Sequence, residues 1–244
     1  MIKKIKTWSV VIKNFITSIT AVSRAQFYSD HDLVSIAIKN RKSIIRYGDG
    51  EFSILNGKDI YYQDYSEQLK AELNEISCSY LNDSKCCNYI LCMPKQFLVC
   101  SGLDLLKNKE YIGSWSLTRK IFKKQYDKSI TYGDSFLFMA ENIDCYNELW
   151  KDAKTIIFVH NNDKYMKNFH NRHVEYIKVP PNNAYSCKDS ILSDIKDIIT
   201  DKDNTVILIS AGPTAKCIAY DLSSNGYWVI DTGHCWDTPL KKRI

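Results

Sequence analysis

Short apolar runs rich in β-branched residues alternate with amphipathic helical patterns along most of this chain. Such alternation is typical of a mostly parallel β-sheet whose crossover helices cover its faces. The predicted strands comprise residues 43–47, 89–93, 155–160, 174–179, 205–210 and 227–231. We therefore expect an α/β fold with a Rossmann-like, mostly parallel sheet flanked by helices.

Between these strands, apolar residues recur every three or four positions in residues 67–81 and 190–200, which predicts surface helices. A further helical pattern at 115–126 lies inside the stretch 94–148. We interpret that stretch as an insertion or cap beside the sheet.

The first 25 residues have an amphipathic helical pattern that contains Lys3, Lys4, Lys6 and Lys13. Their apolar stretch is too interrupted to span a bilayer, and no secretory cleavage site follows it. The helix either packs on the domain, which we favour because amphipathic helices usually face cores, or lies on an anionic membrane surface. No linker or repeat interrupts residues 26–244, so we expect them to form a single domain.

The overall composition argues against some classes of partner. The 244 residues include 33 basic and 28 acidic side chains, a net charge of +5. This excess is too small and too spread out for a nucleic-acid partner, which usually requires a concentrated basic face. The nine cysteines are odd in number and form no Cys-x-x-Cys pair, as expected of reduced thiols in a cytoplasmic protein. Such a protein is either free in the cytoplasm or peripheral at the inner face of the membrane.

The most informative motif, Arg-Tyr-Gly-Asp-Gly-Glu, occupies residues 46–51, directly after a predicted buried strand. In an extended backbone the side chains of Asp49 and Glu51 would point to the same side and converge on one target. Two carboxylates suffice to hold Mg²⁺ or Mn²⁺ when diphosphate oxygens and water complete the coordination. Arg46 adds a cation suited to phosphate. The alternative is that Gly-Asp-Gly is merely a turn.

A second candidate site lies at Gly212-Pro213-Thr214, between a predicted strand and a predicted helix. Glycine permits close backbone approach, proline favours the first helical position, and the following amides attract phosphate. A well-formed turn without a ligand would show the same pattern.

Three more polar residues follow predicted strands or turns. His234 could donate to a phosphate, and Asp231 could orient it, although a lone histidine is more often structural. Asp134 is a candidate general base for an acceptor hydroxyl, and a solvated turn aspartate is the alternative.

Residues 46–51, together with the motifs at 212–222 and 226–234, resemble those of bacterial glycosyltransferases of the GT-D fold. The loop at 181–185 also resembles the Asn-Ala-aromatic segment of that family. The loop after His160 departs from the glycine-rich, arginine-containing loop of the family.

The resemblance implies a nucleotide-sugar transferase whose Asp49 and Glu51 bind Mn²⁺ or Mg²⁺ on the donor diphosphate and act in catalysis. Asp134 is our own candidate for a third catalytic residue. It places Arg46, Gly48, Asn183, Gly212, Thr214, Asp231 and His234 on the donor side. We expect transfer of a hexose such as glucose from a UDP-sugar to a surface polysaccharide or glycoprotein glycan. The alternatives are a non-catalytic nucleotide- or glycan-binding partner of a synthase complex and a metal-dependent phosphohydrolase. The sequence leaves the oligomeric state open.

Overall fold

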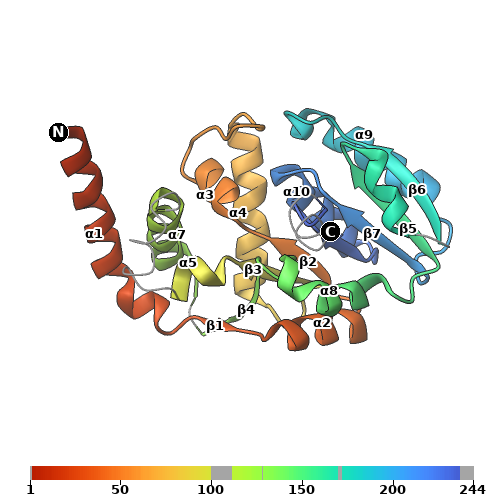
Figure 1. Ribbon diagram of the computed structural model, residues 1–244, viewed down its shortest axis with the longest axis horizontal. Helices are drawn as coiled ribbons and strands as arrows, with labels where there is room; N and C mark the ends of the chain where they lie inside the picture. Colours follow the sequence, from red (N-terminus) through yellow and green to blue (C-terminus); the bar gives the residue numbers. More distant parts are fainter. Residues whose placement is uncertain (1, 100–111, 128, 170–171, 237–244) are drawn as a thin grey trace.

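The computed structural model describes residues 2–99, 112–127, 129–169 and 172–236 (Figure 1). Within them, eight strands form one sheet in the order β1-β4-β3-β2-β8-β7-β5-β6, and every strand pairing in it is parallel. Helices flank the sheet, so the predicted α/β architecture is confirmed.

The strand bounds are β1 Gln26–Phe27, β2 Ser43–Arg46, β3 Tyr89–Met93, β4 Thr131–Asp134, β5 Thr155–His160, β6 His173–Lys178, β7 Thr205–Ile209 and β8 Val229–Asp231. All six strands expected from the sequence are present, with ends that shift by at most two residues. β3 and β7 are buried at every position, as expected of strands covered on both faces.

The α-helices are α1 Ile2–Val22, α2 Asp30–Lys39, α3 Asp49–Leu55, α4 Glu67–Asn82, α5 Lys95–Val99, α7 Ile112–Gln125, α8 Ile143–Asn147, α9 Lys188–Ile198 and α10 Pro213–Ser224. Short 3-10 helices are η2 Ala140–Asn142, η3 Glu148–Trp150, η4 Asp163–Phe169 and η5 Ala184–Cys187. The predicted helices at 67–81, 115–126 and 190–200 correspond to α4, α7 and α9.

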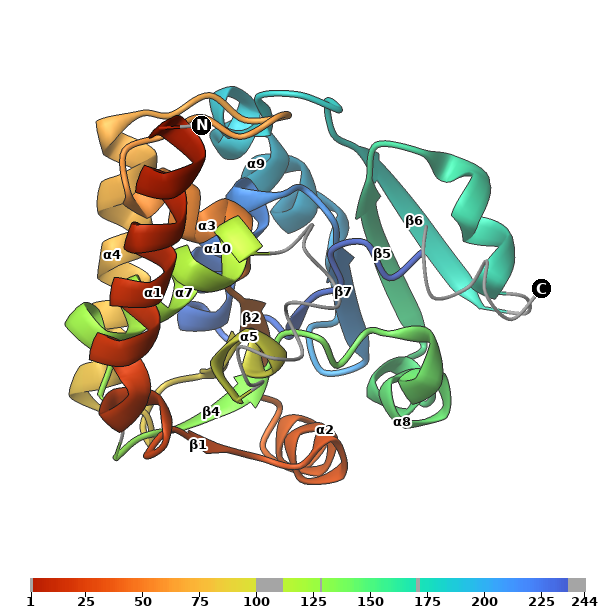
Figure 2. The same cartoon turned by 60° about the vertical axis from the view of Figure 1, so that its left-hand side comes forward.

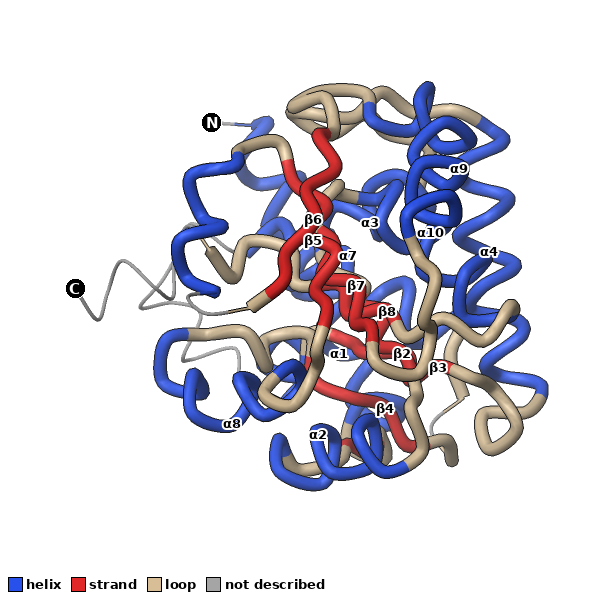
Figure 3. Tube along the Cα trace, turned by 90° about the vertical axis from the view of Figure 1, so that its right-hand side faces the viewer, coloured by secondary structure: helices blue, strands red, loops and turns tan. Residues whose placement is uncertain are grey.

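The sheet separates two apolar cores. Ile45 and Ile207 belong to the core beneath α3, α4, α9 and α10. Ile44 and Phe158 point to the other face, where they join residues of α2 and the α8–η3 segment. Figure 3 shows the strands as one layer between these two groups of helices. Alternate residues of a strand therefore supply both cores, because successive side chains point to opposite faces.

Residues 94–148 are not simply a cap beside the sheet. β4 lies inside this stretch and pairs with both β1 and β3, so the stretch contributes a strand to the sheet itself. The prediction was wrong here because Thr-Tyr-Gly-Asp is short and contains glycine and aspartate, which are rare in strands.

The N-terminal helix α1 packs beside α7 (Figure 2). The rings of Phe15 and Trp115 stack with centroids 5.5 Å apart, and Arg119 Nε donates to Ser18 Oγ at 3.0 Å. Nowhere in the described part of the chain is a helix both long and apolar enough to cross a bilayer.

Candidate active site

Three of the sequence motifs meet where the two halves of the sheet join. β2 comes from the first half of the chain and lies beside β8 from the second half, and β8 lies beside β7. The residues after these strands, 46–51, 210–214 and 231–234, therefore share one edge of the sheet. In open parallel sheets, ligands bind outside this carboxyl edge, where the strand order reverses.

The backbone of the first motif differs from the prediction. α3 begins at Asp49, so Asp49 and Glu51 lie in the first turn of a helix and not in an extended segment. Residues two positions apart on a helix point in different directions, and the predicted convergence through the backbone is wrong. The cause is a capping arrangement in which Gly48 N–H donates to Glu51 Oε2 at 2.7 Å.

Glu51 faces inward and meets a cation that the sequence reasoning missed. Lys216, in α10, places Nζ 3.2 Å from Glu51 Oε1 and 3.0 Å from Asp231 Oδ2. The same ammonium donates to the carbonyl of Gly212 at 3.1 Å. The exposed fractions of the residues are 4% for Lys216, 5% for Glu51 and 0% for Asp231. Burial opposes the charge of Lys216, but the carboxylates of Asp231 and Glu51 outweigh it, and its pKa is raised.

Arg46 is held by the same aspartate. Its backbone N–H donates to Asp231 Oδ2 at 3.1 Å, and its Nε donates to the carbonyl of Asp231 at 2.7 Å. Nη1 donates to the carbonyl of Ser135 at 2.8 Å, and the guanidinium lies over the ring of Phe138. A methyl group at Gly233 would come within 1.6 Å of Arg46 Nη2, so glycine is needed there for the arginine to fit. Asp231 thus positions Arg46 and Lys216. We predicted that Asp231 orients His234, but no contact between these two side chains occurs among the described residues.

Asp49, in contrast, is exposed. Its Oδ2 accepts a hydrogen bond from Ser114 Oγ of α7 at 2.8 Å. Asp49 is therefore the acidic side chain of the first motif that a solvent-borne ligand reaches without disturbing the buried charges.

Tyr62 covers the turn at the start of α10. Gly212 has φ +56°, and a methyl group there would lie 2.6 Å from Tyr62 Cε2. A methyl group at Gly50 would lie 3.6 Å from the Tyr62 hydroxyl oxygen, which places this phenol beside the start of α3 as well. Burial, and next the charge of Glu51, raises the pKa of Tyr62 to about 12. The absence of a side chain at Gly212 thus makes room for the Tyr62 ring.

Two other residues predicted on the donor side contact this tyrosine or lie in the same helix start. The His234 ring meets the Tyr62 ring edge to face, with centroids 6.4 Å apart. Thr214 is fully buried, and its Oγ1 has no hydrogen-bond partner in the described part of the chain.

Asn183 holds the loop that carries Tyr62. It adopts a left-handed backbone conformation with φ 52°, and its N–H donates to the carbonyl of Tyr62 at 2.9 Å. Its side chain accepts from the Asp64 N–H at 2.7 Å and donates to Asp64 Oδ2 at 2.8 Å. The structure therefore brings the 181–185 loop to the site through Tyr62 and gives Asn183 a positioning role.

Asp134 ends β4, which is separated from β2 by β3. Its Oδ1 accepts from the Phe136 N–H at 2.9 Å and the Lys95 N–H at 3.4 Å. Burial raises the pKa of Asp134 to about 6, although the hydrogen bonds from these two amides lower it. The carboxyl group organises the turn after β4, and no described contact joins it to Asp49.

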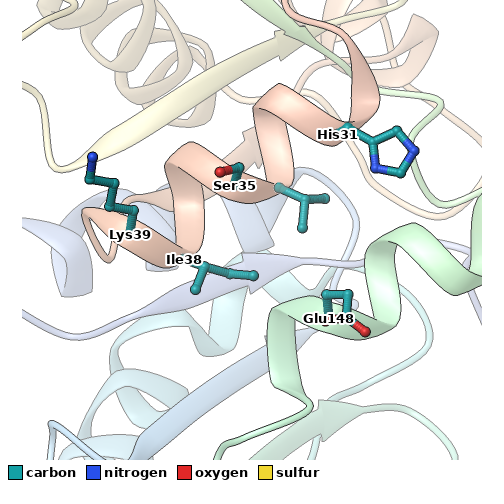
Figure 4. Close-up of a pocket in the computed structure, with 6 residues that line it drawn as sticks. His31, Ser35, Ile38, Lys39 and Glu148 are labelled. Atoms are coloured by element: carbon teal, nitrogen blue, oxygen red, sulfur yellow. The ribbon is translucent and has the colours of Figure 1, made fainter.

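A shallow surface hollow lies elsewhere, between α2 and η3 (Figure 4). Its lining residues are His31, Val34, Ser35, Ile38, Lys39 and Glu148. None of the predicted site residues belongs to it.

The donor atoms at the sheet edge fit a divalent metal in part. Asp49 offers an exposed carboxylate, the hard oxygen ligand that Mg²⁺ and Mn²⁺ prefer. Both carboxylate oxygens of Glu51 already face donors, Gly48 N–H and Lys216 Nζ, so Glu51 is not free to bind a metal in this arrangement. No cluster of three or more His, Cys, Asp or Glu suited to a metal occurs within the described residues.

Sequence reasoning missed Lys216, Tyr62 and Ser114. The available signal for Lys216 was a lysine inside an otherwise apolar helix start, since a fully buried lysine requires acidic partners. No comparable signal marked Tyr62 or Ser114, because their contacts depend on how distant segments pack.

Comparisons with known proteins identify the family of the chain. Residues 44–238 match the model of the glycosyltransferase GT-D fold family. A probable glycosyl transferase Gly from Streptococcus gordonii is 27% identical over 214 residues, which cover 79% of this chain and 29% of that protein. The chain thus spans less than a third of the length of this curated relative.

Two solved structures share the fold. One, described as the highly conserved domain of unknown function 1792 with a distinct glycosyltransferase fold, has a TM-score of 0.77 and 22% identity, and covers 93% of this chain and 84% of that chain. Another, described as a new glycosyltransferase (DUF1792) from Streptococcus sanguinis, has a TM-score of 0.70 and 26% identity, and covers 89% and 84%. Because the family model spans most of the chain and includes all three motifs at the sheet edge, the chain belongs to the glycosyltransferases of the GT-D fold.

Proposed function

We propose that this domain transfers a hexosyl group, with glucose as our first candidate, from a UDP-sugar to a surface polysaccharide or glycoprotein glycan. The observation that carries the proposal is the exposed carboxylate of Asp49 at the junction of β2 and β8, in a chain of the GT-D family. This junction is where nucleotides bind in open parallel sheets.

Asp49 is the residue that would hold Mn²⁺ or Mg²⁺, with diphosphate oxygens and water completing the coordination. When bound, the ion neutralises charge on the departing nucleoside diphosphate. Glu51 contributes indirectly in this proposal, because its carboxylate is engaged by Lys216.

The remaining groups of the site supply position and charge. Arg46 and Lys216 are the two cations of the junction, and Asp231 holds both of them in place. Electrostatic groups fixed in advance stabilise developing negative charge without reorganisation. Tyr62 and His234 form the rim over the start of α10, where donor selection would depend on them.

The test is release of UDP from UDP-glucose with Mn²⁺ and with candidate glycan acceptors. The wild-type chain should turn over the donor, and Asp49→Ala should reduce the rate by about 100-fold or more. Asp194→Ala, an exposed aspartate on α9, is the matched control and should keep the wild-type rate.

Two outcomes would favour the alternatives. Tight binding of UDP without turnover on any acceptor would indicate a non-catalytic partner of a synthase complex. Release of inorganic phosphate from a simple ester, without sugar transfer, would indicate a phosphohydrolase.

A further inference from the structure

The small net positive charge is not spread along the chain, as we expected from its composition, but belongs to the N-terminal segment. The chain has 33 basic and 28 acidic residues, and the first acidic residue is Asp30. Residues 1–29 contain five of the basic residues: Lys3, Lys4, Lys6, Lys13 and Arg24. The remaining residues therefore carry 28 charges of each sign, and the entire net charge of +5 belongs to the segment that forms α1 and its connection to β1.

One face of α1 is fixed to the domain. Val11 is buried with Phe97 and Trp115, and Phe15 stacks on Trp115. Asn14 Nδ2 also donates to Ser116 Oγ at 2.9 Å. These contacts hold the helix in one orientation on α7.

The neighbouring face of α1 is apolar and exposed. It consists of Trp8, Ile12, Ile16 and Ile19, which recur at helical spacing and have exposed fractions of 40%, 52%, 61% and 45%. We call these four residues the α1 stripe. Nine large hydrophobic residues are exposed within the described part of the chain, and five of them, the stripe and Val10, lie on this helix. A contiguous exposed apolar patch of this kind marks an interaction site.

We propose that α1 docks the domain on the surface of a phospholipid bilayer that contains anionic lipids, with the α1 stripe in the interface and with the positive charge of segment 1–29 attracted to the anionic headgroups. This inference is independent of the proposed function. The charge of the segment favours an anionic lipid surface over a protein partner of average composition. The apolar stripe lies within a segment that has five basic and no acidic residues.

The general behaviour of interfacial helices predicts how deep α1 would lie in the membrane and how strongly it would bind. A helix with an apolar face and adjacent lysines lies in the plane of the interface, with its apolar face at the boundary between headgroups and acyl chains. Each basic residue near an anionic surface strengthens binding by about fivefold, and salt screens this attraction. α7 packs against both α1 and α3, and its Ser114 contacts Asp49, so α7 connects the proposed membrane-binding helix to the candidate site (Figure 1).

The experiment is sedimentation of the full chain with vesicles of phosphatidylcholine alone or of phosphatidylcholine mixed with roughly one third phosphatidylglycerol, an anionic lipid. The wild-type chain should sediment with the anionic vesicles and much less with the neutral ones, and raised salt should weaken the binding. Ile12→Ser with Ile16→Ser should weaken binding by about tenfold or more. Ile198→Ser, at an exposed isoleucine of α9, is the control and should bind as wild type.

A charge pair completes the test. Lys13→Glu and Lys196→Glu change the total charge equally at exposed lysines of α1 and α9. Lys13→Glu should weaken binding several-fold, and Lys196→Glu should not. Equal effects of the two would overturn the proposal, as would a wild-type chain that stays in solution with anionic vesicles. Dimerisation through the α1 stripe, detected by analytical ultracentrifugation with no vesicle binding, would also overturn it.

Discussion

Lys216 Nζ lies 3.2 Å from Glu51 Oε1 and joins the start of α10 to the start of α3 inside the protein. Asp231 Oδ2 lies 3.0 Å from the same ammonium, so the lysine is shared by two buried carboxylates. This contact gives the two carboxylates of the Asp-x-Glu motif different surroundings. Its aspartate faces solvent, whereas its glutamate is part of an internal charge cluster.

The first prediction concerns this cluster. Lys216→Met leaves Glu51 buried without a cation and leaves Asp231 with Arg46 alone, whose Nη2 lies 3.6 Å from Asp231 Oδ1, and it should lower the free energy of unfolding by about 3–5 kcal/mol. Adding Glu51→Gln to Lys216→Met should recover part of the loss, because one uncompensated charge is removed. Urea unfolding measures both. Lys188→Met, which breaks the more exposed pairs of Lys188 with Glu72 and Asp221, is the control and should cost less. Fully additive losses in the double variant would contradict the coupling.

The second prediction concerns Gly212. Gly212→Ala adds a methyl group 2.6 Å from the Tyr62 ring at φ +56° and should destabilise the fold by about 1–3 kcal/mol. Gly57→Ala is a control at another glycine of positive φ, since Gly57 has φ +77° with nothing within 4 Å, and it should show a backbone cost without a clash. Tyr62→Ala should relieve part of the Gly212→Ala defect. If Gly57→Ala and Gly212→Ala cost the same, the tyrosine does not press on this turn.

The third prediction concerns pH. Burial raises the pKa of Asp134 to about 6, above its value in the unfolded chain, so the folded state holds the proton more tightly. The stability due to this proton is fully present below the unfolded pKa, near 4, and is lost as the pH rises through about 6. Asp134→Asn mimics the protonated form and should remove this fall, which we expect to be about 2 kcal/mol because the site is partly exposed.

Unfolding free energies measured in urea at pH values from 4 to 7.5 test this sign. Asp194→Asn is the control and should retain the wild-type fall. A wild-type stability that rises through this window relative to Asp134→Asn would contradict the raised pKa.

The fourth prediction separates the two carboxylates of the motif. Asp49→Asn should weaken Mn²⁺ binding in the presence of UDP by about tenfold or more, because an exposed anionic ligand is lost. Glu51→Gln should change it by less than about threefold, because its carboxylate serves Lys216 and Gly48. Electron paramagnetic resonance of free Mn²⁺ measures both. Equal losses in the two variants would show that Glu51 leaves Lys216 and joins the metal.

The sequence predicted the central fold well because the strands β3, β5 and β7 are almost continuous apolar runs and β2 has the apolar pair Ile44-Ile45 at its centre. β1 has only two residues, and β4 contains Gly133 and Asp134, so neither has the composition of a strand. Both pair at one end of the sheet, where tertiary contacts override local preference.

The candidate site was predicted in its location but not in its internal arrangement. Motif positions after the strands placed Arg46, Asp49 and Asp231 at one edge, which the sheet order confirms. The start of α3 was missed because Gly-Asp-Gly is also a turn signal, and the capping bond of Glu51 decides between the two. The pairing of Glu51 with Lys216 joins residues far apart in sequence, and no local pattern specifies it.

The most direct test of the central claim is a crystal structure of the chain with UDP and Mn²⁺. We predict Mn²⁺ at about 2.1 Å from a carboxylate oxygen of Asp49 and in contact with the diphosphate, with Lys216 still between Glu51 and Asp231. A diphosphate bound away from the junction of β2 and β8, with Asp49 still bonded to Ser114 and no metal beside it, would contradict this role of Asp49.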